Sequence, residues 1–385
     1  MRDAVICAAV RTPVGKRGGG LSGVHAVDLS AHVLTALAER SGIDPGVVED
    51  VFWGCVSQVG EQTFNIGRTA VLAAGWPESV PGTTIDRQCG SSQQAVAFAA
   101  ATVISGQADV VVAGGVESMS RVPMGAARGD GSAGKPLGPL FMERYGGVHP
   151  NQGIGAEMIA ERWGFSRTQL DEFSLASHEK AAKAQADGAF DEEIAPVTTP
   201  EGVVSADEGI RPGGTLEKLG SLKTPFKEDG VISAGNASQI SDGAAALLVT
   251  TSDKARELGL TPLVRIHTTV MAGDDPVIML TAPIPATQKL LARSGLSIGD
   301  IGVYEVNEAF APVPMAWLAD TGADEARLNP RGGAIALGHP LGGSGARIMT
   351  TLIHQMRADG IRYGLQTMCE GGGTANATVL ELLDS

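Results

Sequence analysis

Three residues, each in a glycine-framed segment, have the chemistry needed for acyl transfer through a thiolate. Cys89 opens the run CGSSQQAVAFAAATVIS, His339 lies within GGAIALGHPLGGSG, and Cys369 begins CEGGG. Glycine allows the backbone to approach a ligand closely. A thiol, a base and uncovered N–H groups in such segments predict nucleophilic catalysis with stabilisation of an oxyanion.

Cys89 precedes a segment that we expect to form a buried helix. Residues 95–104 are almost all apolar, and Ser91 and Ser92 are typical of a helix start. Unpaired N–H groups and the helix dipole favour an anion there, so we expect the pKa of the Cys89 thiol to fall below about 8.5. The alternative is an inert core cysteine, because free cysteines are among the most buried residues.

The other two residues supply candidates for proton transfer. His339 precedes Pro340 and a glycine-rich turn, where an imidazole nitrogen could take a thiol proton and return it. Cys369 follows a predicted strand at residues 363–368 and precedes Glu370 and three glycines. A second thiol suits a carbon acid, because its pKa can be brought near that of an α-proton. Structural loop residues are the alternative for both.

The pattern of glycines indicates an internal duplication that would bring these segments together. Two blocks of the chain share the order glycine, helix, glycine, strand, glycine. Ser91 and Gly106 of the first block correspond to Ser344 and Gly360 of the second, and the two pairs are separated by nearly the same number of residues. Both helix starts would then meet in one cleft. Between the blocks, residues 121–155 are rich in glycine and proline and are expected to be loop. A helix-rich stretch with a start near Ser166 follows.

Seven sequence blocks, in order along essentially the whole chain, resemble the thiolase family. They are VICAAVRTPVGKRGG, DRQCGSS, GGVESMS, SAGNAS, NEAF, GHPLGGSGAR and CEGGG. The resemblance implies an α/β fold of duplicated βαβαβ-type halves in a layered α/β/α/β/α arrangement, with an inserted loop domain. The resemblance implies that residues 1–120 form the N-terminal half, and that a later segment, about residues 243–262, returns to complete it. Residues 121–242 would be the insertion, and residues 263–385 the C-terminal half.

The resemblance also implies a role for each residue of the active site. Cys89 would be the acylated nucleophile, His339 its base and a donor to the thioester oxygen, and Cys369 the acid/base at the α-carbon. Asn307, in the NEAF block, would hold a water that completes one oxyanion hole. The N–H groups of Cys89 and Gly371 would form the other.

Two further residues match positions that line the coenzyme A site in thiolases. Ser238 would lie near the pantetheine and Arg211 near the nucleotide end, although Arg211 could also be a solvated loop charge. The implied reaction makes or cleaves the carbon–carbon bond of a 3-oxoacyl-CoA, with coenzyme A as co-substrate and no permanently bound cofactor or metal. The expected partners are acyl-CoA, coenzyme A and further copies of the chain in a homodimer or homotetramer.

Departures from the family pattern bear on the substrate. Asn151-Gln152-Gly153 stands where biosynthetic acetoacetyl-CoA thiolases have His-Met-Gly. This favours a degradative 3-ketoacyl-CoA thiolase with a different acyl pocket, similar to actinobacterial enzymes of fatty-acid or steroid breakdown. Gln239 replaces a common glycine, and Glu370 puts a charge beside Cys369. A biosynthetic thiolase is the main alternative. A coenzyme A-binding or redox-sensing protein and a ketosynthase fit the full residue set less well.

Composition argues against other classes of protein. With 385 residues, 43% hydrophobic and 19% charged, the chain suits a compact protein of two or three domains. A net charge of −14 argues against nucleic-acid binding, and no apolar run approaches the roughly 18 residues that span a bilayer. Four cysteines without a C-x-x-C pair, and an N-terminus that resembles a strand, predict a reducing, cytoplasmic location without zinc or disulfides.

Overall fold

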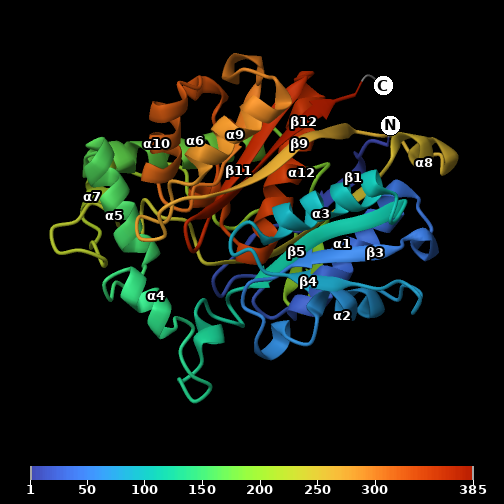
Figure 1. Ribbon diagram of the computed structural model, residues 1–385, viewed down its shortest axis with the longest axis horizontal. Helices are drawn as coiled ribbons and strands as arrows, with labels where there is room; N and C mark the ends of the chain where they lie inside the picture. The colour runs from blue at the N-terminus through green and yellow to red at the C-terminus, as the bar shows by residue number, and fades with distance from the viewer. Residues whose placement is uncertain (1, 384–385) are drawn as a thin grey trace.

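Ten strands of the protein form one long sheet, in which the two sides of the middle have the same pattern of strands. The computed structural model describes residues 2–383. Its sheet has the order β10-β11-β12-β9-β1-β8-β5-β3-β4, with β2 paired to β8 beside this path (Figure 1). The strands are β1 (Val5–Arg11), β2 (Gly15–Lys16), β3 (Asp50–Gly54), β4 (Thr83–Ile85), β5 (Val110–Ser118), β8 (Ser241–Thr250), β9 (Val264–Gly273), β10 (Val303–Val306), β11 (Tyr363–Glu370) and β12 (Thr374–Leu382).

The two halves of this sheet are related by an approximate two-fold repeat. Antiparallel pairing of Val5 with Arg265 and of Ile6 with Val264 joins β1 to β9 at the middle. Going outward, β8 lies antiparallel between β1 and β5, as β12 lies antiparallel between β9 and β11. The next strands, β3 and β10, run parallel to β5 and β11. The duplication expected from the glycine pattern is therefore confirmed.

Helices fill a middle layer and cover both outer faces. α3 (Ser91–Ser105) and α12 (Ser344–Asp359) pack on each other between the halves and share one apolar core with both halves of the sheet. α1 (Ala26–Ser41) and α2 (Ile66–Ala73) cover the N-terminal half, and α9 (Pro283–Ser294) and α10 (Pro312–Thr321) cover the C-terminal half (Figure 1). This is the layered α/β/α/β/α fold expected from the sequence.

The two central helices begin and end where the sequence predicts. α3 begins at Ser91 and α12 at Ser344, and each ends at a left-handed glycine, Gly106 with φ 77° and Gly360 with φ 64°. Glycine adopts this conformation at low cost, so it terminates the helix. The two helix starts touch, because the Ala346 N–H donates to Oγ of Ser92 at 2.8 Å. The residues that precede both helices therefore meet between the halves.

The segment between β5 and β8 contributes several helices, in green in Figure 1, and a small two-stranded sheet that packs on the core of the N-terminal half. Its α6 begins at the expected place, where Ser166 and Gln169 form a capping box. Residues 121–155 are not all loop, however: a helix forms at residues 139–144, too short for a periodic pattern to reveal it. The elements are α4 (Pro139–Arg144), α5 (Gln152–Trp163), α6 (Arg167–Ala186), β6 (Val197–Thr199), β7 (Gly202–Val204) and α7 (Leu216–Gly220). The domain boundaries inferred from sequence stay a prediction.

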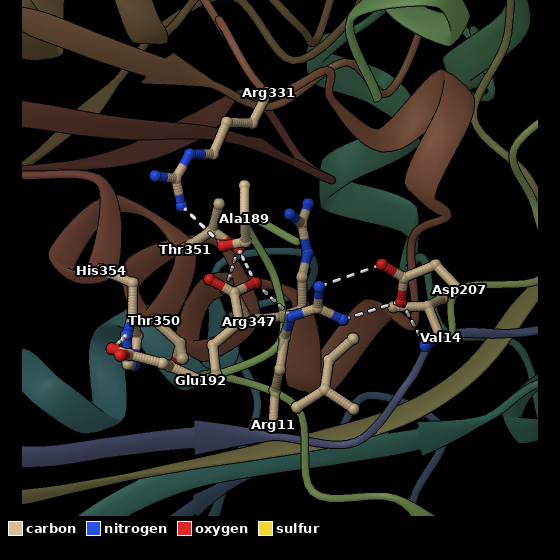
Figure 2. Close-up of polar contacts among 12 residues, drawn as sticks. Arg11, Val14, Ala189, Glu192, Asp207, Arg331, Arg347, Thr350, Thr351 and His354 are labelled. Atoms are coloured by element: carbon tan, nitrogen blue, oxygen red, sulfur yellow. Dashed lines mark hydrogen bonds and ion pairs between the residues drawn. The ribbon is translucent and has the colours of Figure 1, made fainter. Parts of the chain in front are cut away.

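A buried ion-pair network fastens this segment to the first strand. Arg11 of β1 donates to both carboxylate oxygens of Asp207, at 2.7 and 2.9 Å, and to Glu193 at 2.6 Å. All three side chains are fully buried. Figure 2 shows Arg11 facing Asp207, with Arg347 of α12 beside them. Removing one partner from such a pair leaves an uncompensated buried charge, so the network holds the segment in a fixed position.

Two further findings bear on the environment of the protein. All four cysteines are free and buried. Among the helices of residues 2–383, none is both long and apolar enough to cross a membrane. The cytoplasmic location stays a prediction.

Candidate active site

Cys89 lies immediately before the N-cap of α3, as expected, but it is deeply buried. Its exposed fraction is 4%, and apolar side chains from distant segments surround it. Burial raises the pKa of the Cys89 thiol, and the nearby Cys369 and Glu370 raise it further. The N–H groups of Cys89 itself and of Gly371 act in the opposite direction. The expected lowering of this pKa is thus wrong, because burial outweighs the helix start.

The hydrogen bonds of His339 fix which ring nitrogen carries the proton. Its backbone N–H donates to Oγ of Ser241 at 3.1 Å, and its Nδ1 lies 2.6 Å from Oγ of Ser344. The Ser344 hydroxyl donates to the Pro340 carbonyl at 2.9 Å, so we assign it as the acceptor from Nδ1–H. Nε2 is then the basic nitrogen. It lies 3.5 Å from Nδ2 of Asn307.

The surroundings of His339 keep its imidazole neutral. Burial lowers its pKa to about 3, and the buried guanidinium of Arg347 acts in the same direction. Arg347 lies in α12, beside the ion-pair network of Figure 2. A neutral imidazole with an unprotonated Nε2 can accept a proton from a thiol.

Asn307 and Cys369 come together because β10 and β11 are parallel neighbours. Val306 at the end of β10 is opposite Thr367, whose carbonyl accepts the Asn307 N–H at 3.1 Å. The Asn307 side chain and the Ala309 N–H are hydrogen-bonding neighbours of the Cys369 thiol. Burial nevertheless raises the pKa of Cys369 to about 12. The Asn307 Oδ1 is buried and, within residues 2–383, has no hydrogen-bond partner.

The structure thus brings together five of the seven residues expected at the site: Cys89, His339, Cys369, Asn307 and Gly371. The first thiol comes from the N-terminal half and the other four residues from the C-terminal half. Two backbone N–H groups face the first thiol, while the Asn307 amide lies between the imidazole and the second thiol. Such an arrangement can acylate one thiol and transfer a proton at another.

The comparison with known families decides the identity of the chain. The model of the thiolase N-terminal domain matches residues 4–253, and that of the thiolase C-terminal domain matches residues 260–382. The chain belongs to the thiolase family. It is therefore an acyltransferase with thiolase activity.

Individual thiolases are similar to this one over their whole length. It is 50% identical to a steroid 3-ketoacyl-CoA thiolase of Mycobacterium tuberculosis, over 100% of this chain and 95% of the relative. It is 45% identical to a beta-ketoadipyl-CoA thiolase of Escherichia coli, over 99% and 100% of the two chains. The crystal structure of the Bacillus anthracis acetyl-CoA acetyltransferase matches with a TM-score of 0.90 at 39% identity, covering 100% of this chain and 99% of that one.

Of the two residues expected at the coenzyme A site of this thiolase, Arg211 lies on the surface, while Ser238 binds Ala309, a neighbour of Cys369. Arg211 is exposed, and its Nη2 donates to Oε1 of Gln239 at 3.3 Å. Gln239 in turn donates to the carbonyls of Gly209 and Ile335, at 2.9 and 2.8 Å. The half-buried Ser238 donates its N–H to the Ala309 carbonyl at 2.9 Å. Gln239 therefore links Arg211 to α11 (Ala334–Leu337), which ends just before His339.

Asn151, the residue at which the family pattern changes, has a structural role of its own. Its Oδ1 accepts the N–H groups of Gly153 and Ile154, at 2.9 and 3.1 Å, and so caps α5. Its side chain is exposed. Asparagine is among the preferred N-cap residues, so this helix start is well satisfied.

Sequence reasoning missed two residues that hold the site in place. In the sequence, Ser344 was used only as evidence for the duplication, yet in the structure it orients His339. Glu117 is fully buried, and its carboxylate accepts the N–H groups of Ser57 and Gly342, at 3.0 and 2.8 Å. It thereby joins a loop of the N-terminal half to the turn after His339. A glutamate within a strand of buried apolar residues is a signal that could have found it.

Proposed function

We propose that this thiolase cleaves 3-oxoacyl-CoA with coenzyme A by a ping-pong reaction, in the degradation of fatty acids or of steroid side chains or rings. Sγ of Cys89 attacks the 3-oxo carbon, and the bond between C2 and C3 breaks. Acetyl-CoA or propionyl-CoA leaves as a carbanion that takes a proton from Cys369. Coenzyme A then accepts the acyl group from Cys89 and releases a shortened acyl-CoA.

The observation that carries this proposal is the unprotonated Nε2 of His339, which Asn307 Nδ2 faces at 3.5 Å. Because Nδ1 is bound to Ser344, Nε2 can accept the Cys89 proton and return it later. Burial has raised the thiol pKa, so a base within the site is needed before Cys89 can attack. The imidazole, whose own pKa is lowered to about 3, is unprotonated, so Nε2 has a lone pair that can accept the proton.

Two groups of donors support the developing negative charges. We assign the N–H groups of Cys89 and Gly371 to the oxyanion formed during acylation, because both face the thiol. We assign Asn307 and His339 to the thioester oxygen of the leaving enolate, because Asn307 also contacts Cys369. For coenzyme A, we assign the exposed Arg211 to the nucleotide end and Ser238 to the pantetheine.

A mass measurement tests the reaction and identifies the acyl group. The protein is mixed with a panel of 3-oxoacyl-CoA esters, and the mass added to Cys89 is read from the intact chain, with Cys89→Ala as the control. We expect adducts from chains longer or bulkier than acetoacetyl, since each extra methylene in an apolar pocket contributes about 1–3 kcal/mol. Absence of an adduct with every ester would favour a coenzyme A-binding or redox-sensing protein.

A biosynthetic acetoacetyl-CoA thiolase is the second candidate. The likeness to the acetyl-CoA acetyltransferase of Bacillus anthracis favours it, whereas the higher identity to the steroid thiolase favours the degradative reaction. The two candidates differ in how kcat/KM depends on chain length. A maximum at acetoacetyl-CoA that falls steadily for longer esters would support the biosynthetic enzyme.

We also propose that the protein is a homodimer or homotetramer assembled through the edge of the N-terminal half. β4 pairs with β3 and, within residues 2–383, with no strand on its other side. Phe98 of α3, 45% exposed, contacts Phe52 of β3 next to this edge. Unpaired edges beside apolar side chains favour association. Light scattering should show that Phe98→Glu weakens the oligomer, whereas Val203→Glu on β7 should not; a monomeric native protein would contradict this.

A further inference from the structure

Glu370 is a buried carboxyl group placed beside both thiols. It follows Cys369 in β11, is fully buried, and its Oε2 accepts the Thr374 hydroxyl at 2.6 Å. Its Oε1 is buried and has no hydrogen-bond partner in the described part of the chain. The carboxyl group lies so close to Gly90, the N-cap of α3, that a Cβ at Gly90 would overlap Oε1. It therefore occupies the space at the helix start next to Cys89.

The charges around Glu370 come from few groups. Arg87, from the segment before α3, is its one charged neighbour within residues 2–383, and Cys89 and Cys369 are its titratable neighbours. From β12, the uncharged Thr374 and Asn376 face it. Burial raises the pKa of Glu370 to about 7, with the Thr374 hydrogen bond and Arg87 opposing the shift. The negative charge of Glu370 raises the pKa of both thiols.

We propose that Glu370 is a positioning residue whose carboxyl group, at the N-terminal end of α3, controls how readily Cys89 and Cys369 ionise. Its place in catalysis rests on the proposed function. When Glu370 carries a proton, a thiolate at either cysteine is the only negative charge among the three groups. When Glu370 is ionised, the same thiolate must form next to a carboxylate, which costs Coulomb energy in this buried site.

This coupling gives a specific pH dependence for the free enzyme. At pH values well below the pKa of a thiol, each added pH unit normally increases the thiolate fraction tenfold. Above about pH 7, ionisation of Glu370 offsets that gain, so the reactivity of Cys89 should level off. In Glu370→Gln the carboxylate is absent and reactivity should keep rising. The ratio of the variant to the native rate should be near one at pH 6, about twofold at pH 7 and about tenfold at pH 8.

Alkylation by iodoacetamide, with each cysteine followed by peptide mass, measures this ratio. Glu157→Gln is the matched control, because Glu157 is another buried carboxylate, is bound to the N–H groups of Val231 and Ile232, and is not among the groups that shift the pKa of either thiol. Its profile should follow that of the native protein. Thr374→Val is a second variant, which removes the donor to Oε2 and so should move the levelling-off to higher pH. It carries the test if Glu370→Gln does not fold.

The inference is overturned if the profiles of Glu370→Gln and Thr374→Val superimpose on the native one. Alkylation needs no acyl-CoA, so its outcome is independent of whether an acyl adduct forms. Normal acylation together with superimposed alkylation profiles would refute the role of Glu370 alone. A shifted profile without any acyl adduct would refute the proposed reaction and keep the electrostatic coupling.

Discussion

Nδ1 of His339 lies 2.6 Å from Oγ of Ser344, five residues further along the chain. Ser344 is also the first residue of α12, and its hydroxyl donates to Pro340 at 2.9 Å. The start of α12 thus sets the tautomer of the His339 imidazole. We assign this imidazole as the base for Cys89, which lies at the start of α3, the other central helix. One helix start therefore positions the nucleophile, and the other orients its base.

Replacing Ser344 by alanine should slow the acylation of Cys89. The imidazole would lose the acceptor that keeps the proton on Nδ1, a hydrogen bond worth about 1 kcal/mol, so we expect a decrease of roughly fivefold to tenfold. Single-turnover acylation followed by intact mass measures it. Ser344→Thr keeps the hydroxyl and should recover most of the rate. Equal rates for Ser344→Ala and the native protein would remove Ser344 from the mechanism.

The two thiols should separate into different half-reactions. Cys369→Ala should still take an acyl group from a simple acyl-CoA, because that step uses His339 and the N–H donors but no carbon acid. It should fail to exchange the α-protons of acetyl-CoA with deuterated solvent and fail to cleave 3-oxoacyl-CoA. His339→Ala should impair both half-reactions. Normal deuterium uptake by Cys369→Ala, seen by NMR, would assign the carbon-acid step elsewhere.

Arg211→Ala should raise the KM for coenzyme A more than it lowers kcat. A guanidinium that binds the nucleotide end of coenzyme A, as proposed for Arg211, contributes equally to ground-state and transition-state binding, which is the pattern of uniform binding. The exposed Lys223 gives a control of equal charge, since Lys223→Ala removes a cation from the same segment. Saturation curves with coenzyme A distinguish the two variants. An unchanged KM for coenzyme A in Arg211→Ala would show that Arg211 is a solvated charge that does not bind coenzyme A.

Glu370 should make the stability of the protein depend on pH. Its pKa in the folded state, about 7, exceeds the ordinary 4.5, so the folded state binds this proton more tightly than the unfolded state. Its contribution is therefore fully present below pH 4.5 and is lost as the pH rises through 7. Relative to the native protein, Glu370→Gln should gain up to about 3 kcal/mol of unfolding free energy between pH 5 and pH 8. Parallel denaturant curves at both pH values would contradict this.

The elements that hold the site were predictable where a local rule decides them. Ser91 and Gly106 bound α3, and Ser344 and Gly360 bound α12, because helix starts and left-handed glycine ends depend on a few neighbouring residues. The glycines around Cys369 likewise indicated a backbone that approaches a ligand. The positions of the two thiols and the imidazole followed from these elements together with the family resemblance.

Properties that depend on distant contacts were not predictable in this way. The low exposure of Cys89 comes from Met119, Leu341 and Met368, which no local pattern places around it, so the direction of its pKa shift was missed. The link from Arg211 through Gln239 to α11 joins three separate segments. Neither the depth of a site nor such a link is encoded in the spacing of residues along the chain.

The position of β8 has a consequence for how the chain folds during synthesis. β8 lies between β1 and β5, so the first half of the sheet stays incomplete until residue 250 has left the ribosome. At roughly 5–20 residues per second, the interval after β5 emerges lasts about 7–25 s. During that time β5, buried along its full length in the folded protein, exposes an unpaired apolar edge. A nascent chain of this topology is therefore exposed to aggregation, and its yield should depend on chaperones that shield β5 until β8 arrives.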